Sequence, residues 1–210
     1  FQTIQEAISG LERINDFDKE KEEVRKELPL NKKVSNHIPI TIKNVSFSYD
    51  DEKNVVENIS FDIEPGTKVA LVGRTGAGKS TILNLVAGLY KPSKGSIKIG
   101  EIAPFEMPPN MRRRIMGIVP QSFPIYDGTI REAITLYDET ITEEEVITTA
   151  KTVGLHDDII KLPKGYDTVI GEGEMKLSNG QYQLLTLACA LVCNPPILLL
   201  DEVSSGLDSI

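Results

Sequence analysis

The fold is decided by the stretch Lys-Val-Ala-Leu-Val-Gly-Arg-Thr-Gly-Ala-Gly-Lys-Ser-Thr, which runs from Lys68 to Thr81. Residues 68–72 predict an apolar strand, and the residues from 73 onward fit the pattern G-x-x-x-x-G-K-[ST] ahead of a helix predicted over 79–89. Glycines without a Cβ let the loop curl so that its backbone N–H groups point at phosphate oxygens, and the helix adds its positive N-terminal end. The stretch therefore predicts a P-loop for a nucleoside triphosphate.

Within this loop, two side chains carry specific chemistry. The Lys79 ammonium can reach the β- and γ-phosphates, and the Ser80 hydroxyl can ligate Mg²⁺. A plain Gly-rich turn is the alternative, which the apolar strand in front of the loop disfavours. The residues assigned to nucleotide binding here are Gly73, Arg74, Thr75, Gly76, Ala77, Gly78, Lys79, Ser80 and Thr81.

The composition is that of an ordinary globular protein. Of 210 residues, 40% are hydrophobic, enough for a sizeable core. The 31 acidic residues outnumber the 23 basic ones, for a formal net charge of -8. This balance argues against a large basic surface, so no nucleic-acid partner is expected. The basic run Arg112-Arg113-Arg114 is interpreted as a solvated helix face.

Cysteine usage and hydropathy indicate a soluble, reduced chain. Cys189 and Cys193 lie four residues apart on a predicted helix, and His37 and His156 are the only histidines, so we interpret both cysteines as core residues of a cytosolic protein. No apolar stretch reaches the roughly 18–20 residues that cross a bilayer, and no signal-peptide pattern opens the chain.

Periodicity predicts secondary structure along most of the chain. An amphipathic helix is expected over 1–27 and a linker over 28–39. Antiparallel, half-buried strands are predicted over 40–49 and 58–63, and further strands over 96–99 and 115–120. Later elements are a helical region over 129–162, with Thr142 as the N-cap of a helix that Glu143 opens, a helix over 178–192, and a strand over 197–200 buried on both faces.

Two carboxylates follow that last strand. Asp201 and Glu202 lie at its C-terminal end, where ligands of open α/β sheets bind. Asp201 can hold Mg²⁺ through water, and Glu202 can polarise the water that attacks the γ-phosphate. Alone, the pair is more often a strand end that meets solvent; together with a phosphate loop it favours an active site.

The order of the remaining motifs resembles that of ATP-binding cassette (ABC) ATPases. Leu177-Ser178-Asn179-Gly180-Gln181 resembles the signature sequence, Asp201-Glu202 the end of the Walker B strand, and Ser204-Ser205-Gly206-Leu207-Asp208 the D-loop. Tyr49 resembles the aromatic residue that stacks on adenine, a contact worth about 1–3 kcal/mol in nucleic-acid systems. Gln121 in Val-Pro-Gln resembles the Q-loop glutamine, which senses Mg²⁺ and the membrane partner.

The resemblance implies a fold and a site. The expected fold class is α/β, with a P-loop NTPase core around a mixed sheet, an antiparallel β subdomain and a helical signature subdomain. The expected ABC ATPase domain runs over 40–210 and is truncated after the D-loop. ATP and Mg²⁺ are the implied cofactors and ATP hydrolysis the implied reaction. The implied roles are catalytic for Glu202 and Gln121, metal-binding for Ser80, Gln121 and Asp201, and nucleotide-binding for Tyr49 and, across a dimer interface, Ser178, Asn179, Gly180 and Gln181.

Finer features resemble the exporter branch of the family. These are Asp127 to Glu132 after the Q-loop, Thr168 to Gly173 before the signature, and an opening helix similar to the cytosolic end of a last transmembrane helix. The implied partners are a second nucleotide-binding domain and transmembrane domains, at the cytoplasmic face of the cell membrane. The opening helix has a free amphipathic helix as its alternative. A non-transport ABC ATPase or a binding-only regulatory cassette is the rival function, and the cargo is open.

Two departures from the family pattern limit this resemblance. Asn179 stands where the family usually has glycine, which suggests one half of a heterodimeric exporter with a degenerate site, a homodimer being the alternative. Asn tolerates left-handed backbone, so the loop can still form. The sequence also ends at Ile210, before the family's switch histidine. We therefore expect this stretch alone to be weakly active or inactive, with an unsatisfied sheet edge.

Overall fold

Three small sheets and a group of helices make up the described part of the chain. The computed structural model describes residues 37–50, 53–121, 126–171 and 176–201. The predicted helix over 1–27, most of the predicted linker, Glu202 and the predicted D-loop lie outside these residues.

The first sheet is antiparallel, as predicted. Its order is β2-β1-β3, with β1 over Ile40–Phe47, β2 over Val56–Ile63 and β3 over Lys94–Ile99. Ile42 of β1 lies opposite Phe61 of β2 and Ile97 of β3, so alternate side chains of the three strands form one apolar face. β2 and β3 each begin two residues earlier than the hydrophobic pattern predicted.

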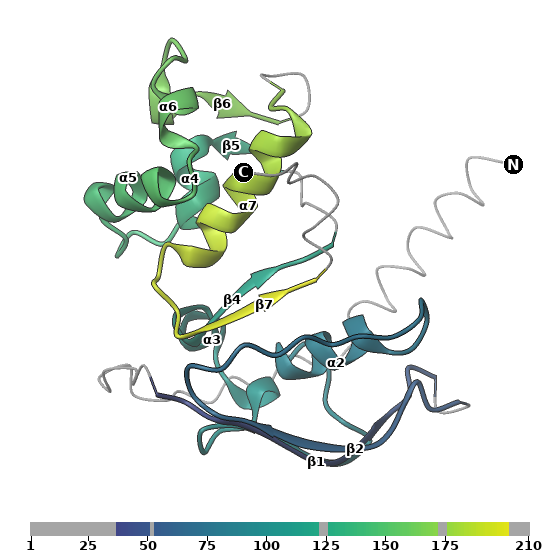
Figure 1. Cartoon of the computed structure of the whole chain (residues 1–210). Coiled ribbons are helices and arrows are strands. Elements are labelled where there is room, and N and C mark those ends of the chain that lie inside the picture. The colour runs from purple at the N-terminus through teal and green to yellow at the C-terminus, as the bar shows by residue number, and fades with distance from the viewer. Residues whose placement is uncertain (1–36, 51–52, 122–125, 172–175, 202–210) are drawn as a thin grey trace, which may run out of the picture.

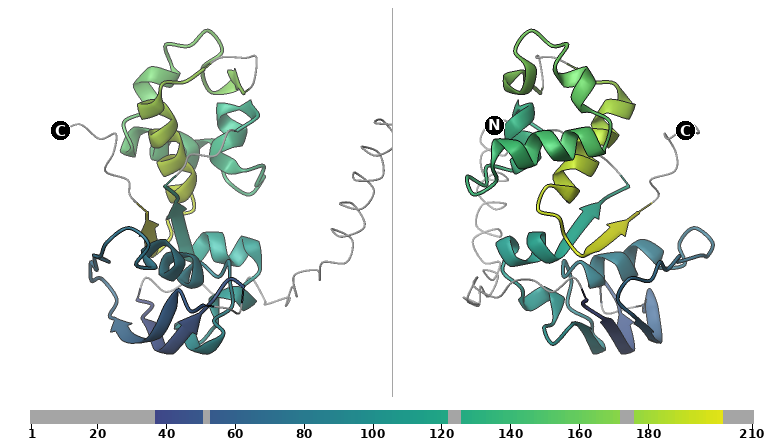
Figure 2. Two further views of the ribbon diagram at one scale, coloured as in Figure 1. Left: turned by 90° about the vertical axis from the view of Figure 1, so that its right-hand side faces the viewer. Right: turned by 60° about the vertical axis from the view of Figure 1, so that its left-hand side comes forward.

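Helix α2, over Lys79–Val86, covers this sheet. Its buried Leu85 and Val86 share a core with the strands and with α3 (Pro109–Ile115). Figures 1 and 2 place α2 between the antiparallel sheet and a second strand pair. The helix ends three residues before the predicted end, because Gly88 adopts a left-handed φ of +72°; a Cβ there would lie 2.5 Å from the Pro104 carbonyl. Pro104 opens the short 3-10 helix Pro104–Glu106.

The second strand pair is parallel and positions two of the predicted site residues. It consists of β4 over Met116–Val119 and β7 over Ile197–Leu200, in register from Met116 opposite Ile197 to Val119 opposite Leu200. The prediction that β7 is buried on both faces is wrong, since Leu198 and Leu200 are 40% and 47% exposed while Leu199 is buried. Leu198 and Leu200 point to the same face of the strand, so that face lacks a cover. Among the described strands β7 pairs only with β4, so its other edge has no partner there.

The predicted strand over 68–72 is also wrong for the described structure. This segment is irregular, and Val69 and Val72 are exposed, Val72 at 90%. A strand forms only where a neighbour takes up its backbone hydrogen bonds, and none of the strands that the structure describes pairs with this segment.

The elements from β5 to α7 form a mostly helical half of the described structure. It contains β5 (Gly128–Thr129), α4 (Ile130–Thr135), α5 (Glu143–Thr152), α6 (His156–Ile159), the 3-10 helix Gly165–Asp167, β6 (Val169–Ile170) and α7 (Asn179–Leu191). Three helices begin with a capping box, in which Thr129, Thr142 and Ser178 are the N-caps. The predicted N-cap at Thr142 is confirmed.

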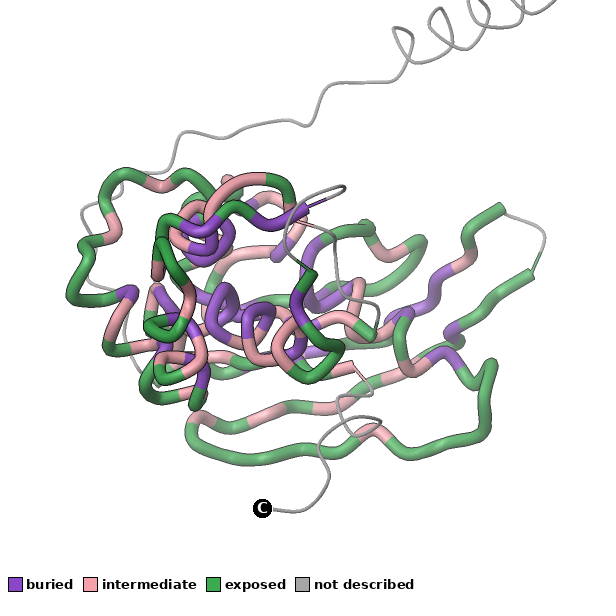
Figure 3. Tube along the Cα trace, turned by 90° about the horizontal axis from the view of Figure 1, so that it is seen from above, coloured by how far each residue is buried: buried purple, intermediate pink, exposed green. Residues whose placement is uncertain are grey.

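Helix α7 forms the centre of a second apolar core. Its Leu185 and Ala188 are fully buried against Ile134 of α4 and Ala150 of α5. Figure 3 shows buried residues gathered on the inner turns of the helices, with exposed outer loops. Cys189 belongs to this core, as predicted, and burial raises the pKa of its thiol to about 11. Of the described helices, none is long and apolar enough to cross a membrane.

The interpretation of Arg112-Arg113-Arg114 as a solvated helix face is wrong for Arg112 and Arg113. Arg112 is half-buried and donates to the carbonyl oxygen of Met107 at 3.1 Å. The Arg113 side chain is 18% exposed, and its guanidinium donates to the carbonyl oxygens of Ile134, at 2.9 Å, and Thr135. Both carbonyls belong to the last turn of α4, where no intrahelical donor remains. Arg114 is exposed, as expected. Arg113 thus joins α3 of the first core to α4 of the second.

Candidate nucleotide site

The predicted phosphate loop has the backbone conformation that its glycines permit. Gly76 and Gly78 adopt left-handed φ angles of +81° and +84°. At Gly78 a Cβ would lie 2.9 Å from the carbonyl oxygen of Val55, so the position has neither the conformation nor the space for a side chain. Gly78 is also the N-cap residue of α2, which lets the loop pass directly into the helix.

Lys79 folds back over this loop. Its Nζ donates to the carbonyl oxygens of Gly73, at 2.9 Å, and Arg74, at 3.2 Å. The first turn of α2 contains no acidic residue, and Ser80 next to Lys79 is exposed. A cation above a glycine loop at a helix N-terminus, with a free hydroxyl beside it, fits the phosphates of a nucleotide and a hard metal ion. Actual contact with either ligand stays a prediction.

The predicted adenine residue, Tyr49, lies beside the start of α2. Its hydroxyl is 3.2 Å from Oγ1 of the buried Thr81, two residues after Lys79. The ring of Tyr49 is perpendicular to those of Phe47 and Tyr90, at centroid distances of 4.9 and 5.2 Å. More than half of Tyr49, 53%, is exposed. The ring therefore has a surface on which a base could stack, next to the phosphate loop.

The parallel pair β4–β7 brings Gln121 and Asp201 to the same edge of a sheet. Gln121 follows β4 by two residues and Asp201 follows β7 directly, and the Asp201 backbone N–H donates to the carbonyl of Val119 at 3.0 Å. A carboxylate and an amide at this edge are suitable oxygen ligands for Mg²⁺. Glu202, the predicted base, lies outside the described residues.

The predicted signature residues form the N-terminal turn of α7. The Oγ of Ser178 accepts from the Gln181 N–H at 3.2 Å, and the Oε1 of Gln181 accepts from the Ser178 N–H at 2.9 Å. Asn179 is the first residue of the helix and does not adopt a positive φ, so its tolerance for left-handed backbone is not used. Asn179 and Gly180 are exposed.

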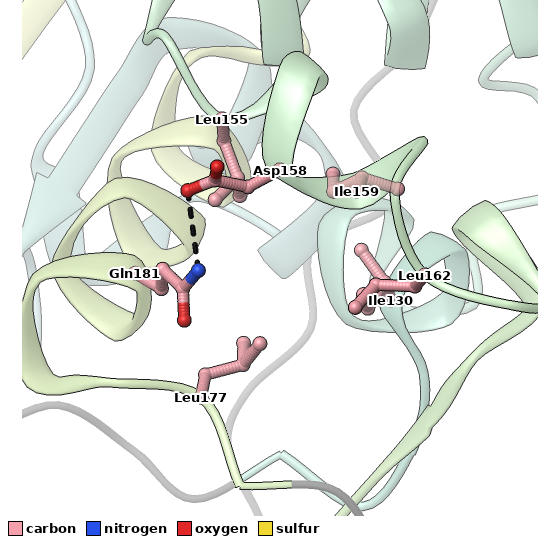
Figure 4. A pocket seen from close by; sticks show the side chains of 7 residues that line it. All are labelled: Ile130, Leu155, Asp158, Ile159, Leu162, Leu177 and Gln181. Atoms are coloured by element: carbon pink, nitrogen blue, oxygen red, sulfur yellow. Dashed lines mark hydrogen bonds between the residues drawn. The ribbon is translucent and has the colours of Figure 1, made fainter.

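Gln181 has a further partner that the sequence did not reveal. Its Nε2 donates to Oδ2 of Asp158 at 3.1 Å, as Figure 4 shows. Both residues line a small pocket with Leu177 and other apolar side chains. Asp158 is 23 residues away from Gln181, and no spacing rule connects them. The contact between the rings of Tyr90 and Tyr49 was missed for the same reason.

Two groups of predicted residues, the phosphate loop with Tyr49 and the signature residues, are separated from each other. The phosphate loop and Tyr49 lie at α2, whereas the N-terminal end of α7 lies at the opposite end of the molecule in Figures 1 and 2. Within one copy of the chain, the signature residues are therefore not brought to the phosphate loop.

Comparison with known proteins agrees with this geometry. Residues 56–205 match the model of the family described as ABC transporter. The chain belongs to the ABC transporter family. With its P-loop, antiparallel sheet and helical half, it has the ABC ATPase fold that was expected.

Relatives of this ABC domain include bacterial and mitochondrial transporters. A putative ABC transporter ATP-binding protein of Mycoplasma genitalium is 43% identical over 80% of this chain and 29% of its own length. The human mitochondrial iron-sulfur clusters transporter ABCB7 is 40% identical over 81% of this chain and 23% of its own. The ABC domain thus spans about a quarter of the length of these relatives.

A solved structure shares nearly the whole ABC domain. A bacterial Atm1-family ABC exporter with ATP bound superposes with a TM-score of 0.79 and 36% identity. The superposition covers 98% of this chain and 36% of that one. The resemblance to exporters that the sequence suggested is confirmed at the level of homologues.

Proposed function

We propose that the chain is the ATP-binding and ATP-hydrolysing domain of an ABC exporter and powers transport through ATP-driven dimerisation. The observation that carries this proposal is the closure of Lys79 over a glycine loop at the start of α2, with Tyr49 fixed beside it. Similarity to an exporter structure that contains ATP supports the same conclusion.

Each predicted residue has a distinct task in this proposal. Tyr49 stacks on the adenine, and Lys79 exchanges the carbonyls of Gly73 and Arg74 for phosphate oxygens. Ser80, Gln121 and Asp201 would hold Mg²⁺, which neutralises charge on the phosphates when bound. Glu202 accepts the proton of the attacking water. In-line transfer needs mainly positioning and charge neutralisation, which these side chains supply.

The separation of the two groups of residues supports a site shared between two domains. Ser178 to Gln181 lie far from the phosphate loop of their own chain, and Ser178, Asn179 and Gly180 are exposed, so this turn can contact a nucleotide that a second domain holds. An exposed Asn179 in place of glycine adds a side chain at that contact. We propose that this weakens one of two composite sites, as in a heterodimeric exporter. Transmembrane domains at the cytoplasmic face of the membrane would complete the transporter.

The test compares three forms of the intact protein: wild type, Glu202→Gln and Asn179→Gly. ATP turnover and ATP-dependent dimerisation are measured for each. We expect Glu202→Gln to abolish turnover while ATP-bound dimers accumulate, since binding is kept and proton transfer is lost. Turnover equal to wild type in Glu202→Gln would refute the role of Glu202. Equal turnover in Asn179→Gly and wild type would refute the degenerate site.

A further inference from the structure

We propose that Tyr90 is a positioning residue for nucleotide recognition, because it holds the ring of Tyr49 in place before a base arrives. The inference rests on the proposed stacking role of Tyr49 and adds a residue to which the sequence motifs assign no function. Tyr90 lies four residues after the end of α2, and Tyr49 follows the end of β1 by two residues.

The three aromatic rings at this point contact one another. Tyr90 lies 5.2 Å from Tyr49 at an interplanar angle of 89°, and 5.4 Å from Phe47 at 48°. The contact between Tyr90 and Tyr49 is edge-to-face, which is favourable because the positive edge of one ring meets the negative face of the other, whereas Tyr90 and Phe47 are tilted. Phe47 is buried in the core of the antiparallel sheet, so the cluster is fixed to a rigid element.

This arrangement restrains Tyr49 and leaves more than half of it exposed. Neither neighbouring ring is parallel to that of Tyr49, and the residue is still 53% exposed. The hydroxyl end is restrained separately, through the contact with Thr81 Oγ1 at 3.2 Å. The ring of Tyr49 is thus restrained by the neighbouring rings, and its hydroxyl is restrained by Thr81.

Restraint of the Tyr49 ring improves binding of a base, because the entropy of fixing the ring has already been lost when the base arrives. An exposed tyrosine after a strand end otherwise samples several rotamers, and a base that stacks on it must select one. A preorganised ring loses less entropy on binding, so affinity rises without a new contact to the ligand. We expect the gain to concern mainly the base, since Tyr90 contacts the rings of Tyr49 and Phe47, whereas the phosphates bind at the loop, which Tyr49 contacts through its hydrogen bond to Thr81.

The test compares binding of ATP with binding of inorganic tripolyphosphate, both with magnesium, by calorimetry on the intact protein. The variants are Tyr90→Leu, which removes the ring, and Tyr90→Phe, which keeps it. We expect Tyr90→Leu to weaken ATP about three- to ten-fold, the size of one aromatic contact, and to leave tripolyphosphate within about two-fold. Tyr90→Phe should bind both ligands like wild type. Tyr90→Met replaces Tyr90→Leu if the latter does not fold.

Other outcomes separate the inference from the proposed function. Equal weakening of both ligands, or unchanged ATP affinity in Tyr90→Leu, would overturn the role of Tyr90 while ATP binding by wild type still stands. Full additivity of Tyr90→Leu with Tyr49→Ala would also overturn it, because a residue that acts through Tyr49 has no effect without that ring. Absence of ATP binding in wild type would refute the proposed function itself.

Discussion

Loss of the Arg113 guanidinium should weaken the connection between the two cores. Arg113→Met keeps most of the stem and removes both hydrogen bonds to the last turn of α4. A hydrogen bond to a charged group contributes about 1.5–3 kcal/mol, and water can replace part of it at a side chain that is 18% exposed. We therefore expect a loss of about 2–4 kcal/mol in the free energy of unfolding. For a domain of this size, this lowers the melting temperature by about 5–15 °C.

Arg114 on the same helix provides the matched control. It is exposed and donates once, to Thr140 Oγ1 at 3.0 Å. Arg114→Met should therefore cost no more than about 1 kcal/mol. Thermal unfolding followed by circular dichroism compares the two variants with wild type. If Arg113→Met and Arg114→Met lower the melting temperature equally, the structural link through Arg113 is refuted.

Three further predictions concern local features of the fold. Thr142→Ala removes the N-cap of α5 and should cost about 1 kcal/mol in urea unfolding, while an unchanged midpoint would contradict the capping box. Hydrogen bonds from the backbone and side chain of Thr129 lower the pKa of Glu132 below its usual 4.5. The ionised carboxylate therefore stabilises the fold above that pH, and this contribution is lost as the pH falls through the lowered value. Glu132→Gln should reduce the loss of unfolding free energy between neutral and acidic pH. An equal loss in wild type and variant would contradict this role of Glu132. Gly117→Val should cost about 1–3 kcal/mol in thermal unfolding, because its Cβ would collide with the Ala190 carbonyl, and a wild-type melting temperature would disprove that contact.

Local sequence patterns predicted the elements that depend on residues close together in the chain. Alternating apolar residues predicted β1 and β2, and Thr142 followed by three glutamates predicted the start of α5. The predicted and observed ends of these elements differ by a few residues, because the last residue of a helix or strand depends on which other segments it contacts. α2 ends where Gly88 approaches Pro104, a contact between segments that the periodicity of one helix cannot reveal.

The failures share a single cause, which is dependence on a partner elsewhere in the chain. Residues 68–72 have the apolar composition of a strand but no described strand beside them, and β7 has a neighbour on one side alone. Arg113 looks like any surface arginine until α4 lies against α3. Burial and pairing are properties of packing, so composition cannot decide them.

The sequence by itself determined which chemistry is present. Gly78, Lys79 and Ser80 specify a phosphate loop through glycine geometry and charge, and the order of the later motifs specifies the ABC family. Only the tertiary structure decided how those residues are grouped. It placed Tyr90 and Thr81 against Tyr49 and separated the signature from the phosphate loop. The physical reason is that motifs act over a few adjacent residues, whereas contacts between distant segments arise only when the hydrophobic cores bring them together.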